Sequence, residues 1–367
     1  MPGEREGQPP LRVLVTGANG LAGSAVVRRV LAAGHEPVAL LRPGADETLL
    51  PPGTERLYWQ IVQLSPRPSD WALYFPEFHA GEAFEAHAAT GTPVTHPEEA
   101  SRVFSEARAD AVVHCAAVVS TGKPDLAESF RMNVEVTRLL LAAAEHAGLR
   151  RWVQVSSMSA HPENRSIYGG TKWQQELAVR QSRLSWAVLR PGLIYGPQRR
   201  GIFARLAQIV AKWNVVPLPN GGNEPAAAVH VDDFADAALR AAQEDTAANQ
   251  CFELGGAERW TFRELVQTMA DVLGRKPALL TLPLPLCRLA AIAGEAVLPR
   301  PPLTTDNLEG LLTARWPDIT AAREVLGFSP RPFAEGFREC LDKGLLPAEP
   351  TPIRNPVPRK RRRKAKS

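Results

Sequence analysis

Cysteine is scarce in this chain: four occur among 367 residues, at widely separated positions. No CxxC pair occurs, and the histidines show no spacing typical of metal ligands. A disulfide framework and a structural zinc site are therefore not expected, and a reducing cytoplasmic compartment is favoured. The cysteines are Cys115, Cys251, Cys287 and Cys340.

Long apolar runs are lacking as well, and without a stretch of about 20 uncharged apolar residues we expect no membrane span. Residues 277–299 come nearest, but prolines, Arg288 and Glu295 interrupt them. We expect an amphipathic segment of a second domain here, with shallow contact with a membrane surface as the alternative. The opening residues MPGEREGQPP lack the apolar core of a signal peptide, and we expect residues 1–10 to be disordered.

Outside the last residues of the chain, the sequence lacks an excess of positive charge. The formal net charge is +4, and seven basic residues lie within 359–366, behind the proline-rich stretch 347–358. We expect residues 346–367 to form a disordered tail, first proline-rich and then basic, without a specific nucleic-acid partner. Weak attraction to nucleic acid or to anionic lipid is the alternative for this tail.

A glycine-rich turn near the amino end is the first positive signal. The apolar run LRVLVTG (11–17) leads into a turn and an amphipathic helical pattern. Gly17 would permit the tight turn, Gly20 would let the backbone approach a pyrophosphate, and Gly23 would let helix and strand pack closely. The turn, with Asn19 and Leu21 between the glycines, is therefore the predicted dinucleotide-binding segment.

Arg42 follows the second apolar run, at 37–41, where a carboxylate would be expected for NAD. An arginine at this place offers a fork of donors to a 2′-phosphate instead. The sequence thus favours NADP(H), with NAD as the alternative. An arginine that is merely solvated at a strand end is the other interpretation.

Tyr168 and Lys172 lie four positions apart in YGGTK, eleven positions after Ser157. On a helix, this spacing places both side chains on one face. A nearby ammonium favours the phenolate and is expected to lower the pKa of Tyr168. Ser157 would hold a substrate oxygen against the phenol, so the three residues form a candidate proton-transfer device for hydride chemistry.

Taken together, the motifs resemble the short-chain dehydrogenase/reductase superfamily, in its extended, NAD-dependent epimerase/dehydratase branch. The resemblance covers about residues 11–345 and implies that Tyr168 is the general acid/base. It further implies that Lys172 holds the nicotinamide ribose and that Ser157, in preference to Ser156, orients the substrate. The motifs are TGANGLAG, HCAA (114–117), MNVEVT (132–137), VSSMS (155–159), YGGTK (168–172) and LRPGLIYGP (189–197).

Further cofactor contacts are implied by the resemblance alone. The two alanines beyond the fourth strand would line the cofactor, Asn133 would help fix the local backbone and a water, and the segment 191–193 would pass near the nicotinamide. The residues in question are Ala116, Ala117, Asn133, Pro191 and Leu193.

Apolar runs alternate with helical patterns up to residue 190, which predicts an α/β fold. We expect a Rossmann-type doubly wound parallel sheet over 11–195, with an insertion at about 51–93, and a smaller carboxy-terminal α/β substrate domain over 196–345. Some later segments are expected to return to the first domain. The clearest strands are 12–16, 37–41, 111–119, 152–156 and 186–190.

A metal site is not expected. His230, Asp232 and Asp233 suggest one at first sight. A strand followed by an aspartate that caps a helix over 234–242 accounts for them better.

The expected function is NAD(P)-dependent hydride transfer at a hydroxyl or keto group of a small or lipid-like substrate. A nucleotide-sugar epimerase or dehydratase is one alternative, and a non-catalytic NAD(P)-binding assembly or regulatory subunit is another. The short separation of Ser157 and Tyr168 resembles atypical family members and weakens the epimerase alternative. A small molecule is the expected partner, and a homodimer is the assembly considered.

Overall fold

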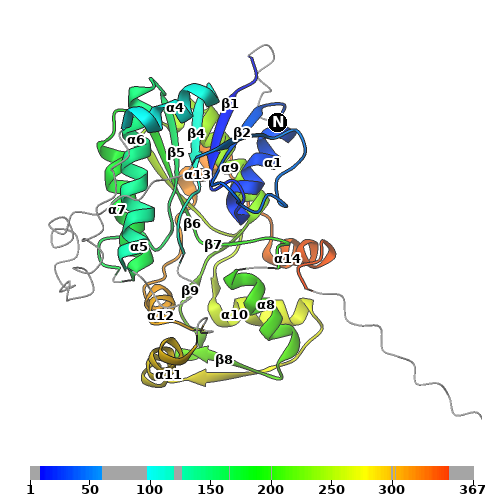
Figure 1. Ribbon diagram of the computed structural model, residues 1–367. Helices are drawn as coiled ribbons and strands as arrows, with labels where there is room; N and C mark the ends of the chain where they lie inside the picture. Colours follow the sequence, from blue (N-terminus) through cyan, green and yellow to red (C-terminus); the bar gives the residue numbers. More distant parts are fainter. Residues whose placement is uncertain are drawn as a thin grey trace, which may run out of the picture.

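A seven-stranded parallel sheet forms the centre of the half of the molecule that is expected to bind the dinucleotide, here called the nucleotide-binding half (Figure 1). The computed structural model describes residues 9–59, 97–119, 126–164, 166–199, 201–298, 301 and 303–346. Most of the expected amino-terminal disorder, most of the expected insertion and nearly all of the expected tail lie outside these residues. In spatial order the strands are β11 (Gln250–Leu254), β6 (Ser185–Pro191), β5 (Arg151–Val155), β4 (Ala111–His114), β1 (Arg12–Thr16), β2 (Glu36–Leu41) and β3 (Glu55–Tyr58).

The strand order reverses between β1 and β4, and open parallel α/β sheets have their ligand-binding crevice at the carboxyl ends of the strands at such a reversal. Strands β4 and β5 are buried along their whole length, because both faces of the sheet are covered, and their sequences AVVH and RWVQV show no regular alternation of apolar and polar residues. The strand expected over 111–119 is wrong in length, since pairing stops at His114. Two residues later, the Ala116 N–H donates a 3.1 Å hydrogen bond to the side-chain hydroxyl of Thr16 and not to a backbone carbonyl of β1.

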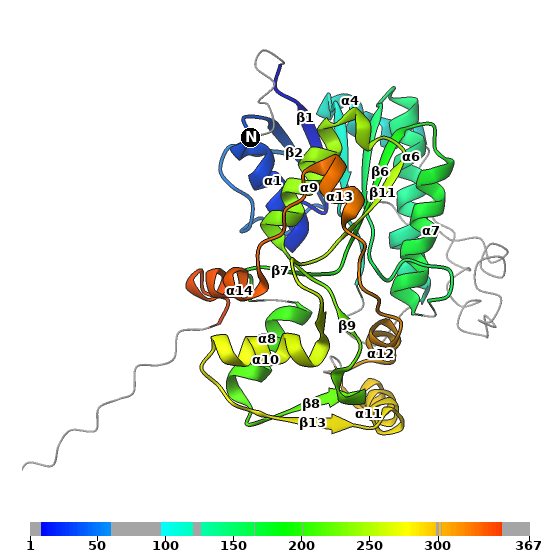
Figure 2. The ribbon, with the colours of Figure 1, turned by 180° about the vertical axis from the view of Figure 1, so that it is seen from behind.

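Helices cover both faces of the sheet, which confirms the doubly wound α/β fold (Figures 1 and 2). Each face has its own apolar core between helices and strands. On one face lie α1 (Leu21–Ala32), α9 (Val231–Gln243) and α13 (Thr320–Leu326); on the other lie α4 (Pro97–Ala107), α6 (Val136–His146) and α7 (Ile167–Gln181).

A second lobe lies beyond the carboxyl ends of the strands, with a core of its own (Figure 2). Tyr195 stacks on Phe203 with 4.9 Å between ring centres, and Phe333 and Phe337 complete this aromatic cluster. The lobe contains α8 (Ile202–Lys212), α10 (Phe262–Val272), α11 (Leu284–Val297), α12 (Thr305–Leu312) and α14 (Phe333–Asp342).

Three short two-stranded sheets connect and complete this lobe. The segment 277–299 contains both a strand and a helix, and no described helix has the length and apolarity that a membrane crossing requires. Segments beyond residue 195 return to the large sheet, as β11, α9 and α13 show. The paired strands are β7 (Leu193–Tyr195) with β10 (Ala228–His230), β9 (Pro225–Ala226) with β12 (Trp260–Thr261), and β8 (Val215–Pro219) with β13 (Ala278–Leu282).

Candidate functional site

The glycine turn between β1 and α1 is built around two close backbone approaches. Gly17 has φ +62°, and a Cβ there would lie 2.8 Å from the backbone of Ala116. A Cβ on Gly23 would lie 2.2 Å from the carbonyl oxygen of Gly17. Side chains are therefore excluded at both positions, and the turn packs directly on the segment after β4.

Gly20 is the N-cap of α1, and no side chain caps the helix there. The first N–H groups of the helix are consequently left to an anion, and a pyrophosphate fits this arrangement. Asn19 and Leu21 flank Gly20 and are both half-buried, whereas Gly20 itself is exposed. The turn thus fits a dinucleotide at the crevice between β1 and β4.

Asn133 fixes the segment after β4, which includes the half-buried Ala116 and Ala117. Its side-chain oxygen accepts the Val118 N–H at 2.7 Å, and its amide donates to the Val118 carbonyl at 3.1 Å. The same amide also donates to the Thr171 hydroxyl at 3.1 Å. Asn133 lies in η1 (Arg131–Glu135), a π-helical turn, and ties the cofactor side of the crevice to helix α7.

The two adjacent serines after β5 have different surroundings. Ser156 is buried and donates a 2.6 Å hydrogen bond to Glu176, whose carboxylate also pairs with Arg190 at 2.7 Å. Ser157 lies instead within hydrogen-bond reach of the Tyr168 phenol. Ser156 is therefore part of a buried ion network, and Ser157 is the serine that faces the candidate proton donor.

Tyr168 and Lys172 share one face of α7, with the Lys172 Nζ 5.9 Å from the centre of the Tyr168 ring. The Nζ donates to the Val155 carbonyl at 2.9 Å. Burial raises the pKa of Tyr168 to about 12, and the hydrogen bond with Ser157 opposes this rise. Burial lowers the pKa of Lys172 to about 8. The expectation of a lowered Tyr168 pKa is therefore wrong for the protein without a cofactor, because the effect of burial dominates.

Asp306 is a site residue that sequence reasoning missed. Its carboxylate accepts the Ile167 N–H at 2.5 Å and also the backbone N–H of Tyr168. Ser166 supplies the N-cap of the same helix by accepting the Gly169 N–H at 3.0 Å. Burial raises the pKa of the Asp306 carboxyl group, and the two backbone hydrogen bonds oppose that rise. A residue of the second lobe thus holds the start of the helix that carries Tyr168.

The remaining candidate cofactor residues lie at strand ends. Arg42 is exposed directly after β2, and no hydrogen bond or ion pair of its guanidinium is found among the described residues. Pro191 ends β6 and accepts the Met158 N–H at 3.0 Å, next to the serine pair. The half-buried Leu193 begins β7, where its N–H donates to the Ala227 carbonyl at 2.6 Å.

The helix start at 231 corrects one expectation. His230, and not an aspartate, is the N-cap of α9, and its Nδ1 accepts the Asp232 N–H at 3.2 Å. His230, Asp232 and Glu339 each bring one ligand-type atom within 4.8 Å of the others. The Lys343 Nζ lies 2.5 Å from Glu339 and 4.0 Å from Asp232.

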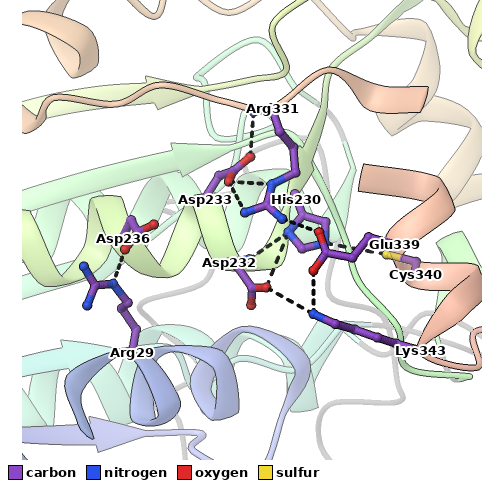
Figure 3. A network of polar contacts seen from close by, with 9 residues as sticks. All are labelled: Arg29, His230, Asp232, Asp233, Asp236, Arg331, Glu339, Cys340 and Lys343. Atoms are coloured by element: carbon purple, nitrogen blue, oxygen red, sulfur yellow. Dashed lines mark hydrogen bonds and ion pairs between the residues drawn. The ribbon is translucent and has the colours of Figure 1, made fainter. Parts of the chain in front are cut away.

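Arg331 extends this group into an ion-pair network, drawn in Figure 3. Its guanidinium lies 2.6 Å from Glu339 and 2.7 Å from Asp233. Side-chain cations thus balance the carboxylates around His230. The network joins α9 of the nucleotide-binding half to α14 of the second lobe and fixes how the two pack.

A parallel sheet with an order reversal, an open glycine turn at that reversal and a Ser–Tyr–Lys set beside it define a dinucleotide-binding α/β protein. Residues 13–255 match the model of the NAD dependent epimerase/dehydratase family. The chain belongs to this family, and the resemblance seen in its motifs is confirmed.

Curated proteins with similar sequences include both a subunit of a larger complex and an enzyme. The mitochondrial NADH dehydrogenase [ubiquinone] 1 alpha subcomplex subunit 9 of Arabidopsis thaliana is 30% identical over 219 residues, or 55% of this chain and 54% of that protein. A ceramide reductase of Caulobacter vibrioides is 32% identical over 183 residues, or 48% of this chain and 54% of that protein. The chain thus spans about half the length of these curated relatives.

Among solved structures, the UDP-glucuronic acid 4-epimerase of Bacillus cereus in complex with UDP-glucuronic acid and NAD has a TM-score of 0.60. The identity is 19%, with 90% of this chain and 98% of that chain covered. This likeness shows the fold, which extends through both lobes.

Proposed function

We propose that the protein is an NAD(P)-dependent oxidoreductase that reduces a carbonyl group, or oxidises the matching alcohol, of a small or lipid-like substrate. The observation that carries this proposal is the placement of Ser157 and Lys172 around Tyr168, beside the crevice that the glycine turn borders. A bound nicotinamide would supply or accept the hydride. The ceramide reductase among the relatives supports the lipid-like substrate class.

The protonated phenol of Tyr168 is the form that the reduction of a carbonyl group requires. With a pKa raised to about 12, the phenol carries its proton at neutral pH. It can donate that proton to the substrate oxygen as the carbonyl carbon accepts the hydride, which leaves an alcohol and a phenolate. Lys172, with a pKa lowered to about 8, is close enough to stabilise that phenolate.

NADP(H) is the proposed cofactor. Arg42 is exposed at the end of β2, where the adenosine ribose lies in folds of this type. A guanidinium can form paired hydrogen bonds with a 2′-phosphate, whereas it offers a ribose hydroxyl no matching acceptor. The four cysteines are all free, which supports a reducing cytoplasmic location as part of the same proposal.

Nucleotide-sugar epimerisation is the second candidate, and the fold that the chain shares with the Bacillus cereus epimerase favours it. That reaction would use the same tyrosine, but each cycle would return the cofactor to its starting oxidation state. The cofactor would therefore not need to dissociate between cycles. The Arabidopsis relative supports a third possibility, an assembly subunit in which the dinucleotide is structural.

Cofactor exchange and the Tyr168→Phe variant test the proposal together. The purified protein should bind NADPH reversibly, as followed by nicotinamide fluorescence, and should oxidise it with a panel of carbonyl compounds. Tyr168→Phe should lower turnover by at least about a hundredfold and leave NADPH affinity within about twofold, because general acid catalysis is lost while the crevice is unchanged.

Tyr58→Phe is the matched control, since Tyr58 lies on β3 and bonds Glu47 at 2.6 Å. Full turnover by Tyr168→Phe would place the proton donor elsewhere. Retention of NAD(H) that does not exchange would favour the epimerase or the assembly subunit.

A further inference from the structure

The outer face of α11 is apolar and exposed. Leu286, Leu289, Ile292 and Val297 are exposed by 51%, 64%, 58% and 78%. The residues that α11 turns inward are small, since Cys287 and Ala291 are the buried ones. Helices of globular proteins bury their large apolar residues, so this helix has the reverse arrangement.

No charged residue interrupts that outer face. With about 100° between successive residues, the exposed uncharged positions of α11 cover an arc of roughly 160°. Arg288 lies outside this arc and pairs with Glu309 at 3.4 Å, and Glu295 accepts the Thr305 N–H at 2.6 Å. The exposed positions are Pro285, Leu286, Leu289, Ala290, Ile292, Ala293, Ala296 and Val297.

The sheet formed by β8 and β13 adds a second apolar surface at the same end of the molecule (Figure 2). Val215 and Pro217 on β8 are exposed, and their partners Ala278 and Leu280 on β13 are exposed as well. Trp213, just before β8, is 52% exposed. We call these residues, together with the exposed positions of α11, the distal face.

The charges that accompany the distal face are mostly positive. Residues 212–219 and 274–298 contain four basic residues and one acidic residue. Lys212 and Lys276 are exposed where β8 and β13 begin, next to Trp213, and Arg275 is half-buried beside them. Exposed leucines with a tryptophan and lysines at their edge are the pattern of proteins that bind the surface of a bilayer.

We propose that the distal face binds the surface of an anionic lipid bilayer. The large apolar side chains of α11 enter the boundary between head groups and acyl chains, and the lysines beside Trp213 contact the lipid phosphates. The proposal does not depend on the reaction that the crevice catalyses.

Vesicle binding tests it with the full-length chain. The protein should co-sediment with vesicles of equal parts phosphatidylcholine and phosphatidylglycerol, and much less with phosphatidylcholine alone. The double variant Leu289→Ser, Ile292→Ser should bind at least about tenfold more weakly, because two exposed apolar side chains no longer enter the lipid. Leu49→Ser, at an exposed leucine of the nucleotide-binding half, should bind like the unchanged protein.

Charge reversal provides a second, independent variant. The pair Lys212→Glu, Lys276→Glu should abolish the preference for anionic vesicles, whereas Arg338→Glu, on an exposed residue of α14, should leave it unchanged. A chain that ends at Leu346 lacks the seven basic residues of the tail and should retain binding through the distal face.

Two outcomes would overturn the proposal. Loss of all vesicle binding in the chain that ends at Leu346 would assign the attraction to the tail alone. Binding that the serine pair leaves unchanged, with self-association that the same pair abolishes in sedimentation velocity, would make the distal face an interface between copies of the chain.

Discussion

The carboxylate of Asp306 accepts the backbone N–H of Ile167 at 2.5 Å, so a residue of the second lobe caps the helix that carries Tyr168. This contact joins segments 139 positions apart. Through this hydrogen bond, the second lobe helps to fix the position of Tyr168, the candidate proton donor. Closure or loosening of that lobe would move the start of α7.

Asp306→Ala should therefore affect both stability and the proposed reaction. Loss of the two accepted backbone hydrogen bonds should lower the free energy of unfolding by about 1–2 kcal/mol. Turnover should fall more than NADPH affinity, because the glycine turn is unaffected. Asn307→Ala, on the same helix α12, is the control. Equal losses in turnover and cofactor affinity, measured by steady-state kinetics and fluorescence titration, would contradict a role specific to Tyr168.

The Asp306 contact shows what the sequence could and could not predict. The glycine turn was predictable because Gly17, Gly20 and Gly23 act through spacing within one strand–turn–helix unit. No local pattern links Asp306 to Ile167, since only tertiary packing brings them together. The pKa of Tyr168 was predicted in the wrong direction for a related reason. Sequence spacing reveals a neighbouring charge, but it does not reveal how deeply the phenol is buried.

Substitutions at the two serines should separate their roles. Ser156→Ala removes a donor to the buried Glu176 carboxylate and should lower the free energy of unfolding by about 1–3 kcal/mol, while turnover of the folded protein persists. Ser157→Ala removes the acceptor of the Ser159 N–H and should lower the free energy of unfolding by only about 1 kcal/mol, but it should lower turnover at least about tenfold, because the substrate oxygen loses a partner. Urea titration and kinetics on both variants check this, and the reverse pattern would exchange the assignments.

Gly23→Ala should disrupt the start of α1. The added Cβ would lie 2.2 Å from the Gly17 carbonyl oxygen, so the helix must shift away from the turn. We expect a loss of about 1–3 kcal/mol in unfolding free energy and dinucleotide binding at least about tenfold weaker. Gly310→Ala is the matched control, because a Cβ on that residue of α12 would meet no atom within 4 Å. Unchanged binding by Gly23→Ala would show that the turn does not hold the pyrophosphate.

Arg42→Asp should change the preference between cofactors. The carboxylate would repel a 2′-phosphate and could accept hydrogen bonds from ribose hydroxyls, so NADPH affinity should fall by more than tenfold while NADH affinity holds or rises. Arg102→Asp makes the same charge change at an exposed residue of α4 and should leave the ratio unaltered. Fluorescence titrations with both nucleotides measure the ratio. Equal weakening of NADPH and NADH would remove Arg42 from the site.

His114 should make the protein sensitive to acid. Its ring is buried between the hydroxyls of Thr16 and Thr137, at 2.8 and 3.0 Å, and burial lowers the pKa of His114 to about 3. The unfolded chain takes up this proton near pH 6.5, and the folded chain does so only near pH 3. The contribution of neutral His114 to the free energy of unfolding is thus fully present above about pH 6.5 and is lost as the pH falls toward 3. At pH 5, about 2 kcal/mol of this free energy is already lost.

Urea denaturation at pH 7 and pH 5 measures this contribution. His114→Asn should be less stable than the unchanged protein at pH 7 but should lose less on acidification. Burial also lowers the pKa values of His35, His161 and His230, so some acid sensitivity should persist. His146→Asn, at an exposed position that ends α6, should retain the full pH dependence. A pH dependence unaltered in His114→Asn would mean that His114 takes up its proton at the same pH in the folded and the unfolded chain. The ring would then not be held as a neutral imidazole between Thr16 and Thr137.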